Sequence, residues 1–139
     1  MPTTQTERPT PTDPVRLIMS RTLATVQPED DLVTVAQELT ASEVGAVFVE
    51  TPGEPLGLIS ERDLVTVIGI NGDLERFAEQ QASDIMTTDV VTTTAGTSII
   101  EVGQLMREAS VRHVPVTEGG RIVGVVSIRD VLNVLLGDD

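Results

Sequence analysis

Residues 57–63 read Gly-Leu-Ile-Ser-Glu-Arg-Asp, and residues 124–130 read Gly-Val-Val-Ser-Ile-Arg-Asp. The second stretch begins 67 residues after the first and keeps four of its seven residues, with aliphatic residues between them. Other pairs recur at the same offset, among them Ile18-Met19 with Ile85-Met86, Thr25 with Thr92, and Val44, Val47 and Val49 with Val111, Val114 and Val116. The chain is therefore an internal duplication.

Each repeat predicts the same order of elements. Apolar residues at helical spacing predict a first helix, namely Leu32, Val35, Ala36 and Leu39, then Ile99, Val102, Gly103 and Met106. Pro28 and the acidic residues 29–31 suit a first helical turn. Two short strands follow, 46–50 and 56–60 around a Pro-Gly turn, then 114–117 and 122–127 around Gly119-Gly120. A second helix opens at Ser60 and at Ser127, so each repeat reads as β-α-β-β-α.

These patterns give an α/β fold of two small repeats. We expect a disordered tail over 1–14, repeat 1 over 15–69, a turn and linking helix over 70–84, repeat 2 over 85–136 and a tail over 137–139. A repeat of this size cannot bury its own sheet, so we expect the two to pack with pseudo-two-fold symmetry and to leave two equivalent clefts between them.

Composition excludes several classes of function. The 139 residues carry a formal charge of −13, with 22 acidic residues against nine basic residues, all arginine, so binding to nucleic acid or to an anionic membrane is not expected. The absence of cysteine excludes disulfides and thiolate metal sites, and one histidine cannot build an ordinary zinc site. Neither a signal peptide nor a membrane span is recognisable, which predicts a cytoplasmic protein.

The Ser-x-x-Asp spacing of the repeated motif has two compatible interpretations. Ser60 with Asp63, and Ser127 with Asp130, form a capping box in which Asp replaces Glu. The same helix N-terminus attracts anions and hydroxyl oxygens, and a carboxylate there can accept hydrogen bonds from both hydroxyls of a ribose. The motif alone does not choose between a structural cap and a binding site, but its duplication favours binding.

The pattern resembles the CBS (cystathionine-β-synthase) domain family, whose tandem pair forms a Bateman module. The resemblance covers about Val15 to Leu136 and rests on Gly-aliphatic-aliphatic-Ser-x-x-Asp in both repeats. A second family feature, an aliphatic-Pro-Val strand, is present as Val114-Pro115-Val116, whereas repeat 1 has Phe48 in place of the proline.

The resemblance implies ligand contacts at matching positions. Asp63 and Asp130 would hold a ribose diol, Ser60 and Ser127 would lie beside the ribose or phosphate, and Leu58 or Val125 would line the base. Each cleft would also draw on the other repeat, Asp130 on Val44 and Gly45, and Asp63 on Val111 and Arg112. Segments near Thr22 and Thr88-Asp89 would add backbone contacts to the base. Arg62, Arg112, His113 and Arg129 would set the phosphate preference, although His113 also fits an ordinary strand residue.

The two sites should be unequal, because repeat 1 has Gly45-Ala46 where repeat 2 has Arg112-His113. Met19 and Met86 fit core packing.

The second helices carry more apolar residues than one buried face needs, namely Leu64, Val65, Val67 and Ile68, then Val131, Leu132, Val134 and Leu135. We interpret the excess as a dimer surface.

The sequence thus predicts a regulatory module rather than an enzyme. The homodimer would bind an adenosine-containing effector (AMP, ADP, ATP, S-adenosylmethionine or similar), would require no cofactor, and would pass the signal to an unknown partner protein. The alternative is a ligand-independent dimerisation or scaffold module, in which both clefts are vestigial.

Overall fold

The structure is a computed structural model that describes residues 8–52 and 56–137. The chain divides into two compact units. We call Thr22–Val90 the Asp63 unit, and Met1–Arg21 together with Val91–Asp139 the Asp130 unit. The expected pseudo-two-fold packing of one unit on the other stays a prediction.

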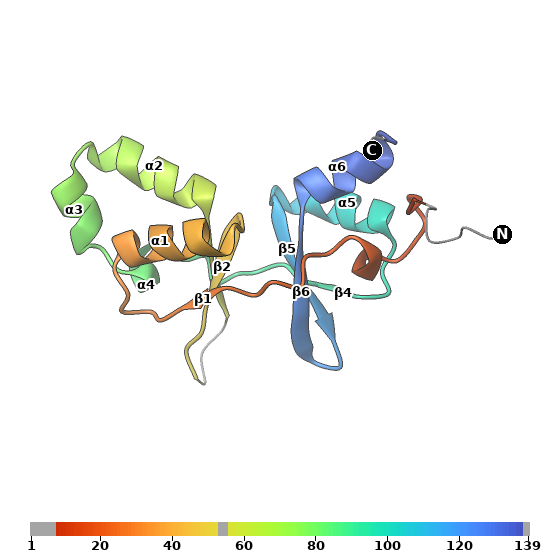
Figure 1. Cartoon of the computed structure of the whole chain (residues 1–139), viewed down its shortest axis with the longest axis horizontal. Helices are drawn as coiled ribbons and strands as arrows, with labels where there is room; N and C mark the ends of the chain where they lie inside the picture. Colours follow the sequence, from red (N-terminus) through yellow and green to blue (C-terminus); the bar gives the residue numbers. More distant parts are fainter. Residues whose placement is uncertain (1–7, 53–55, 138–139) are drawn as a thin grey trace. The chain divides into compact units, whose positions relative to one another are not determined.

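The Asp63 unit is a three-stranded sheet with its helices (Figure 1). In chain order its elements are β1 (Thr25–Val26), α1 (Leu32–Ser42), β2 (Ala46–Val49), β3 (Gly57–Ser60), α2 (Glu61–Asn71), α3 (Leu74–Glu79) and α4 (Ala82–Ile85). β2 is the central strand, parallel to β1 and antiparallel to β3. The predicted β-α-β-β-α order is confirmed. The Pro-Gly turn between β2 and β3 reaches residues 53–55, which lie outside the described residues.

The Asp130 unit has the same topology. Its elements are a 3-10 helix (Val15–Leu17), β4 (Thr93–Thr94), α5 (Ile99–Ala109), β5 (His113–Glu118), β6 (Arg121–Ser127) and α6 (Ile128–Leu135). β5 is central, parallel to β4 and antiparallel to β6, and a β-bulge at Val116/Thr117 interrupts the β5–β6 register.

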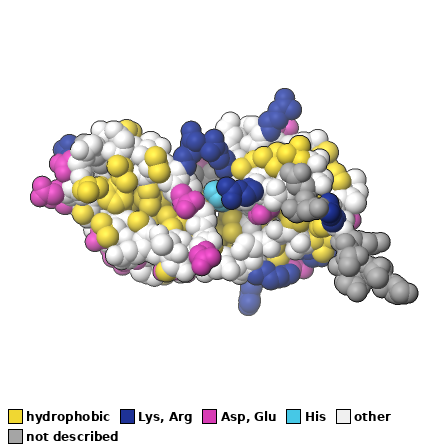
Figure 2. Space-filling view, turned by 45° about the horizontal axis from the view of Figure 1, so that its top comes forward, with side chains coloured by type: hydrophobic (Ala, Val, Ile, Leu, Met, Phe, Trp, Pro, Cys, Tyr) yellow, Lys and Arg dark blue, Asp and Glu magenta, His cyan; other side chains and the backbone are white. Residues whose placement is uncertain are grey.

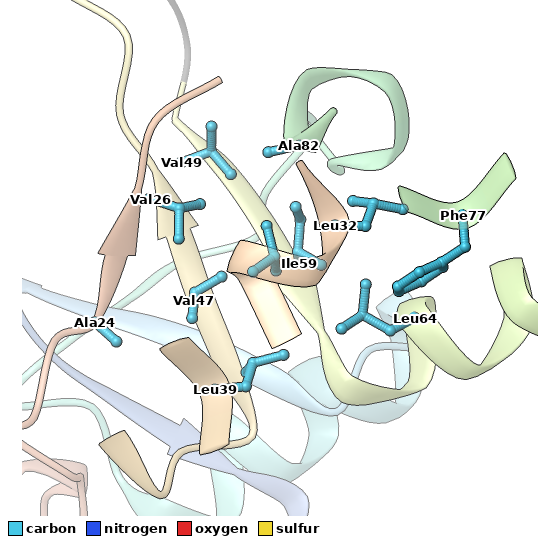
Figure 3. Packing of buried hydrophobic residues seen from close by; sticks show 11 residues of the cluster. Ala24, Val26, Leu32, Leu39, Val47, Val49, Ile59, Leu64, Phe77 and Ala82 are labelled. Carbon is cyan, nitrogen blue, oxygen red and sulfur yellow. The ribbon is translucent and has the colours of Figure 1, made fainter. Parts of the chain in front are cut away.

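The core of each unit lies between one face of the sheet and its helices. In the Asp63 unit, Leu32 and Leu39 of α1 and Leu64 of α2 pack on Val47 and Ile59 of the sheet (Figure 3). Alternation along β2 sends Val47 and Val49 to this core and Ala46 and Phe48 to the opposite face. Ile99, Val102, Met106, Val114, Val126 and Val131 fill the equivalent core of the Asp130 unit.

The compact units exchange the segments that precede their first strands. In sequence, Val15–Ser20 leads into repeat 1, but it packs in the Asp130 unit, where Val15 and Met19 join the core. Residues 82–87 lead into repeat 2 and pack in the Asp63 unit, where Ala82, Ile85 and Met86 contact the core. We call these two segments the leaders. The methionines at matched positions take part in core packing, as predicted, with Met19 buried in the core and the half-buried Met86 packed against it.

Three local expectations need correction. Helix α1 begins at Leu32 with Asp31 as its N-cap, so residues 28–30 precede the helix instead of forming its first turn. The reason is tertiary, because the carbonyls of Pro28 and Asp30 accept hydrogen bonds from Ser83 and Ala82 of the leader. Described structure also starts before Val15, since residues 10–13 form a hydrogen-bonded turn. Finally, the linking region holds two helices, α3 and α4, instead of one.

Candidate functional site

Each Ser-x-x-Asp motif forms a complete capping box where a strand becomes a helix. The Asp63 amide donates to Ser60 Oγ at 3.2 Å, and the Ser60 amide donates to Asp63 Oδ2 at 2.8 Å. At the start of α6 the matching distances are 3.2 Å to Ser127 Oγ and 3.0 Å to Asp130 Oδ2. The structural interpretation of the motif is confirmed. A carboxylate has two oxygens and about four lone-pair sites, so the same aspartate can accept the capping hydrogen bond and also accept hydrogen bonds from a ligand.

The segment before each central strand is fixed against the same junction. Gly45 O accepts from the Glu61 amide at 2.9 Å, and Arg112 O accepts from the Ile128 amide at 2.8 Å. Val44 and Gly45 therefore lie beside Ser60 within one unit, and Val111 and Arg112 lie beside Ser127 within the other. Their predicted contribution to the opposite clefts stays a prediction.

Exposure at these junctions suits binding from solvent. The Ser and Asp side chains of both motifs are half-buried, and Arg62 and Arg129 between them are exposed. Arg112 is also exposed, whereas His113 is a half-buried residue of β5 that pairs in register with Ser127. The Asp130 junction thus carries the cationic Arg112 where the Asp63 junction has Gly45.

The residues expected to line the base are each paired with a leader. Ser20 and Val125 exchange two backbone hydrogen bonds of 2.8 and 2.9 Å, and Thr87 and Leu58 exchange two of 2.9 and 3.0 Å. Val125 is buried and Leu58 is half-buried. Thr22 is exposed and begins the Asp63 unit, directly after the leader of the Asp130 unit. Each leader is therefore positioned beside the motif of the other repeat.

The motif glycines are explained by these leaders. A Cβ on Gly57 would lie 2.5 Å from Met86 Sδ, and a Cβ on Gly124 would lie 2.7 Å from both Met19 Sδ and the backbone oxygen of Ser20. Only glycine leaves room for the leader at this distance. The exchange itself was not predicted, although the repeated Ile-Met pair was a signal that both leaders are buried.

A pocket in the Asp130 unit adds residues that the sequence analysis missed. It has a volume of about 280 Å³ and is lined by Asp130, Asn133, Val134 and Gly137 with Ile18, Pro9 and Arg8. Asn133 and Val134 follow Asp130 by three and four residues, so these three lie on one face of α6, and Gly137 lies just beyond the end of that helix. Arg8 and Pro9 belong to the segment that was expected to be disordered, which is why nothing indicated them.

Comparison with known proteins decides the family. The sequence model of the CBS domain matches the chain twice, over residues 15–70 and 82–137. The chain belongs to the CBS-domain family. The two matches follow the sequence repeats, whereas the compact units of this CBS-domain protein exchange their leaders.

Named relatives and solved structures agree with this assignment. The chain is 32% identical over 113 residues to the mitochondrial CBS domain-containing protein CBSX3 of Arabidopsis thaliana, covering 78% of this chain but only 54% of that protein. It is 27% identical to the CBS domain-containing protein YhcV of Bacillus subtilis, covering 84% and 81% of the two chains. A CBS-domain protein structure from Agrobacterium tumefaciens has a TM-score of 0.72 at 33% identity, with 81% and 89% coverage.

A fourth match is a solved structure from Burkholderia ambifaria, described as a putative signal-transduction protein with CBS domains. It gives a TM-score of 0.74 at 27% identity and covers 86% of this chain and 87% of that one. Within residues 8–52 and 56–137, no helix is both long and apolar enough to cross a membrane.

Proposed function

We propose that this CBS pair is a regulatory sensor that binds an adenosine-containing ligand and passes the signal to a partner protein. The observation that carries the proposal is the presence, in both repeats, of a half-buried aspartate in a capping box at the end of a strand. A family whose members include a putative signal-transduction protein supports a regulatory role without catalysis.

The chemistry of each junction suits a nucleoside. The carboxylate of Asp63 or Asp130 accepts hydrogen bonds from the two ribose hydroxyls, while Ser60 or Ser127 lies beside the ribose. Leu58 and Val125 offer aliphatic surface to the base. Exposed Arg62, Arg112 and Arg129 are the cations within reach of a phosphate at these junctions.

Ligand charge separates the candidate effectors. A formal charge of −13 opposes polyphosphates in general, so phosphate binding depends on local arginines. AMP, ADP and ATP require those arginines, whereas S-adenosylmethionine does not. The Asp130 junction, with Arg112 and Arg129, is the better phosphate site of the two.

Isothermal titration of the full chain with AMP, ADP, ATP, NADH, S-adenosylmethionine and cyclic di-AMP tests the proposal. At least one should bind more tightly than about 1 mM, and Asp63→Ala combined with Asp130→Ala should abolish that binding. Asp84→Ala, which removes the acidic member of another capping box outside the two motifs, is the control and should leave affinity unchanged. If no adenosine compound binds below about 1 mM, sensing is rejected.

A second candidate is a ligand-independent dimerisation module. Exposed apolar side chains on the second helices favour it, with Val65 and Ile68 of α2 exposed by 68% and 40%, and Leu132 and Leu135 of α6 by 43% and 40%. Figure 2 shows hydrophobic side chains gathered on the surface of each unit. Light scattering and ligand titration of Asp130→Ala separate the two functions. A scaffold keeps its dimer and its partner in this variant, whereas a sensor loses its response to the ligand.

A further inference from the structure

Residues 8–14 hold a place in the Asp130 unit that the sequence did not predict. Asp13 O and Pro11 O accept hydrogen bonds from the amides of Ile99 and Ile100 at the start of α5, each at 2.9 Å. At its other end, Arg8 donates to Gly137 O, just beyond α6, at 3.1 Å. We call residues 8–14 the strap. It joins the N-terminal end of α5 to the C-terminal end of α6.

The strap corresponds to helix α3 of the Asp63 unit. The 67-residue offset relates 8–14 to 75–81, and the hydrogen bonds follow the same offset, since Ile99 N donates to Asp13 O where Leu32 N donates to Gln80 O. The bridge between Pro14 and Ser98 likewise matches that between Gln81 and Asp31. The two segments therefore occupy equivalent places.

Their side chains differ in what they contribute to the core of the unit. Phe77 of α3 is 6% exposed and belongs to the core of the Asp63 unit, where Figure 3 shows its ring beside Leu64 of α2. The residue at the equivalent position of the strap is Thr10, and Val131 stands in place of Leu64. Thr10 is exposed, so the strap adds no buried ring to the core of the Asp130 unit, and the pocket beside Asp130 is lined instead by its neighbours Arg8 and Pro9.

The lining of that pocket combines three kinds of chemistry. Asp130 supplies an acceptor, Arg8 supplies a guanidinium, and Ile18 with Val134 supplies aliphatic surface. A guanidinium recognises phosphate through paired, charge-assisted hydrogen bonds. A ligand that carries both vicinal hydroxyls and an anionic group complements this set, and a neutral nucleoside complements only part of it.

We propose that the strap extends the ligand site of the Asp130 unit, and that Arg8 makes this site select a nucleoside monophosphate over the uncharged nucleoside. The inference rests on the proposed function and adds a specificity-determining residue to it. Arg8 precedes both segments that match the CBS-domain model, so the family pattern does not assign it. In the Asp63 unit the repeat offset places Glu75, an acidic residue, at the position of Arg8.

Titration calorimetry with AMP and with adenosine tests the inference on the full chain. The wild type should bind AMP about tenfold more tightly than adenosine, because one charge-assisted hydrogen-bonded contact is gained. Arg8→Ala and Arg8→Gln should both reduce this preference, leaving only the part that Arg112 and Arg129 supply, while adenosine affinity stays within about twofold. Arg8→Gln keeps a donor for Gly137 O, so a purely structural role of Arg8 would leave its preference intact. Arg16→Ala, which removes an exposed arginine of the leader outside the pocket, should behave as the wild type.

Each other outcome overturns a specific claim. Equal affinities of the wild type for AMP and adenosine, or a preference that is undiminished in Arg8→Gln, overturn the inference and leave sensing intact. Loss of AMP binding in Asp63→Ala but not in Asp130→Ala places the site in the other unit and also overturns it. Failure of the wild type to bind either compound overturns the inference, and the proposed function is then decided by the other effectors.

Discussion

At the scale of single residues, the two repeated glycines have the same role with different tolerances. A Cβ on Gly57 would meet Met86 Sδ and the Val49 side chain, whereas a Cβ on Gly124 would also meet the backbone oxygen of Ser20. A methionine side chain can move aside, but a backbone oxygen within a two-bond bridge to Val125 cannot.

We therefore expect Gly124→Ala to destabilise the protein by about 1–3 kcal/mol, and Gly57→Ala to destabilise it less. Adding Met86→Ala should recover part of the loss in Gly57→Ala, while Met19→Ala should not rescue Gly124→Ala. Urea unfolding measures each difference, and Gly96→Ala, where nothing lies within 4 Å, is the control. Equal losses at both motif glycines would contradict the proposed difference between side-chain and backbone contacts.

A single carboxyl gives a pH-dependent contribution. The Thr34 backbone amide, followed by the Thr34 side chain and the Val33 amide, lowers the pKa of Asp31 below its ordinary value of 3.8. A folded-state pKa below the unfolded value adds stability that is present above about pH 3.8 and is lost as the pH falls through the folded pKa.

Asp31→Ala should therefore lower the melting temperature more at about pH 6 than at about pH 2.5, because protonation weakens the cap in the wild type. Asp31→Asn keeps a capping oxygen without a titrating proton, so it should stay close to the wild type near neutral pH. Thermal scans across this pH range provide the measurement. A loss in Asp31→Ala that does not change with pH would show that the charge of this cap contributes nothing.

At the scale of elements, α1 and α5 end in the same way. Glu43 and Ser110 are related by the repeat, follow the last helical residue and have left-handed φ values of 55° and 57°. Each amide donates back to carbonyls in the last helical turn. A left-handed residue with a side chain costs about 1–2 kcal/mol relative to the right-handed form, and glycine avoids this cost.

Ser110→Gly and Glu43→Gly should each stabilise the protein, by about 0.5–1 kcal/mol. Ala109→Gly, one residue earlier and inside α5, should destabilise it by a similar amount, because a helical glycine only adds freedom to the unfolded chain. Denaturant midpoints measure both signs. Destabilisation by Ser110→Gly would mean that its side chain contributes more than the left-handed backbone costs.

The strap and α3 show how equivalent elements diverge. Each segment supplies a carbonyl to the first amide of a long helix in its own unit, Asp13 O to Ile99 of α5 and Gln80 O to Leu32 of α1, and each also contacts the second helix region of that unit. Helix α3 adds a buried aromatic ring, whereas the strap adds Arg8 and leaves a pocket. The same backbone role therefore permits a filled core in one unit and a candidate ligand site in the other.

At the scale of the whole chain, the leaders and the strap make each unit depend on residues far away in sequence. The Arg8–Gly137 hydrogen bond joins residues 129 positions apart. Removal of the N-terminus should therefore affect the Asp130 unit, which contains most of repeat 2, and should affect repeat 1 much less.

Deletion of residues 1–14 should increase amide exchange of Ile99 and Ile100 by about tenfold or more, since both lose the carbonyls that accept from them. The Leu32 amide is the internal control, because its acceptor, Gln80 O, remains. Hydrogen exchange followed by NMR gives both rates in one sample. Slow exchange at Ile99 in the truncated chain would contradict the role assigned to the strap.

The sequence by itself determined what local patterns and the repeat can encode. It predicted the β-α-β-β-α order and the capping roles of Ser60, Asp63, Ser127 and Asp130, because these depend on residues a few positions apart. It also predicted the duplication and the family, because the same motif recurs at a fixed offset of 67 residues. Only the tertiary structure decided the exchange of leaders, the start of α1 after Asp31, and the pocket that joins Arg8 to Asp130. These depend on hydrogen bonds and packing between distant segments, which hydrophobic periodicity does not specify and which a Thr- and Pro-rich N-terminus does not suggest.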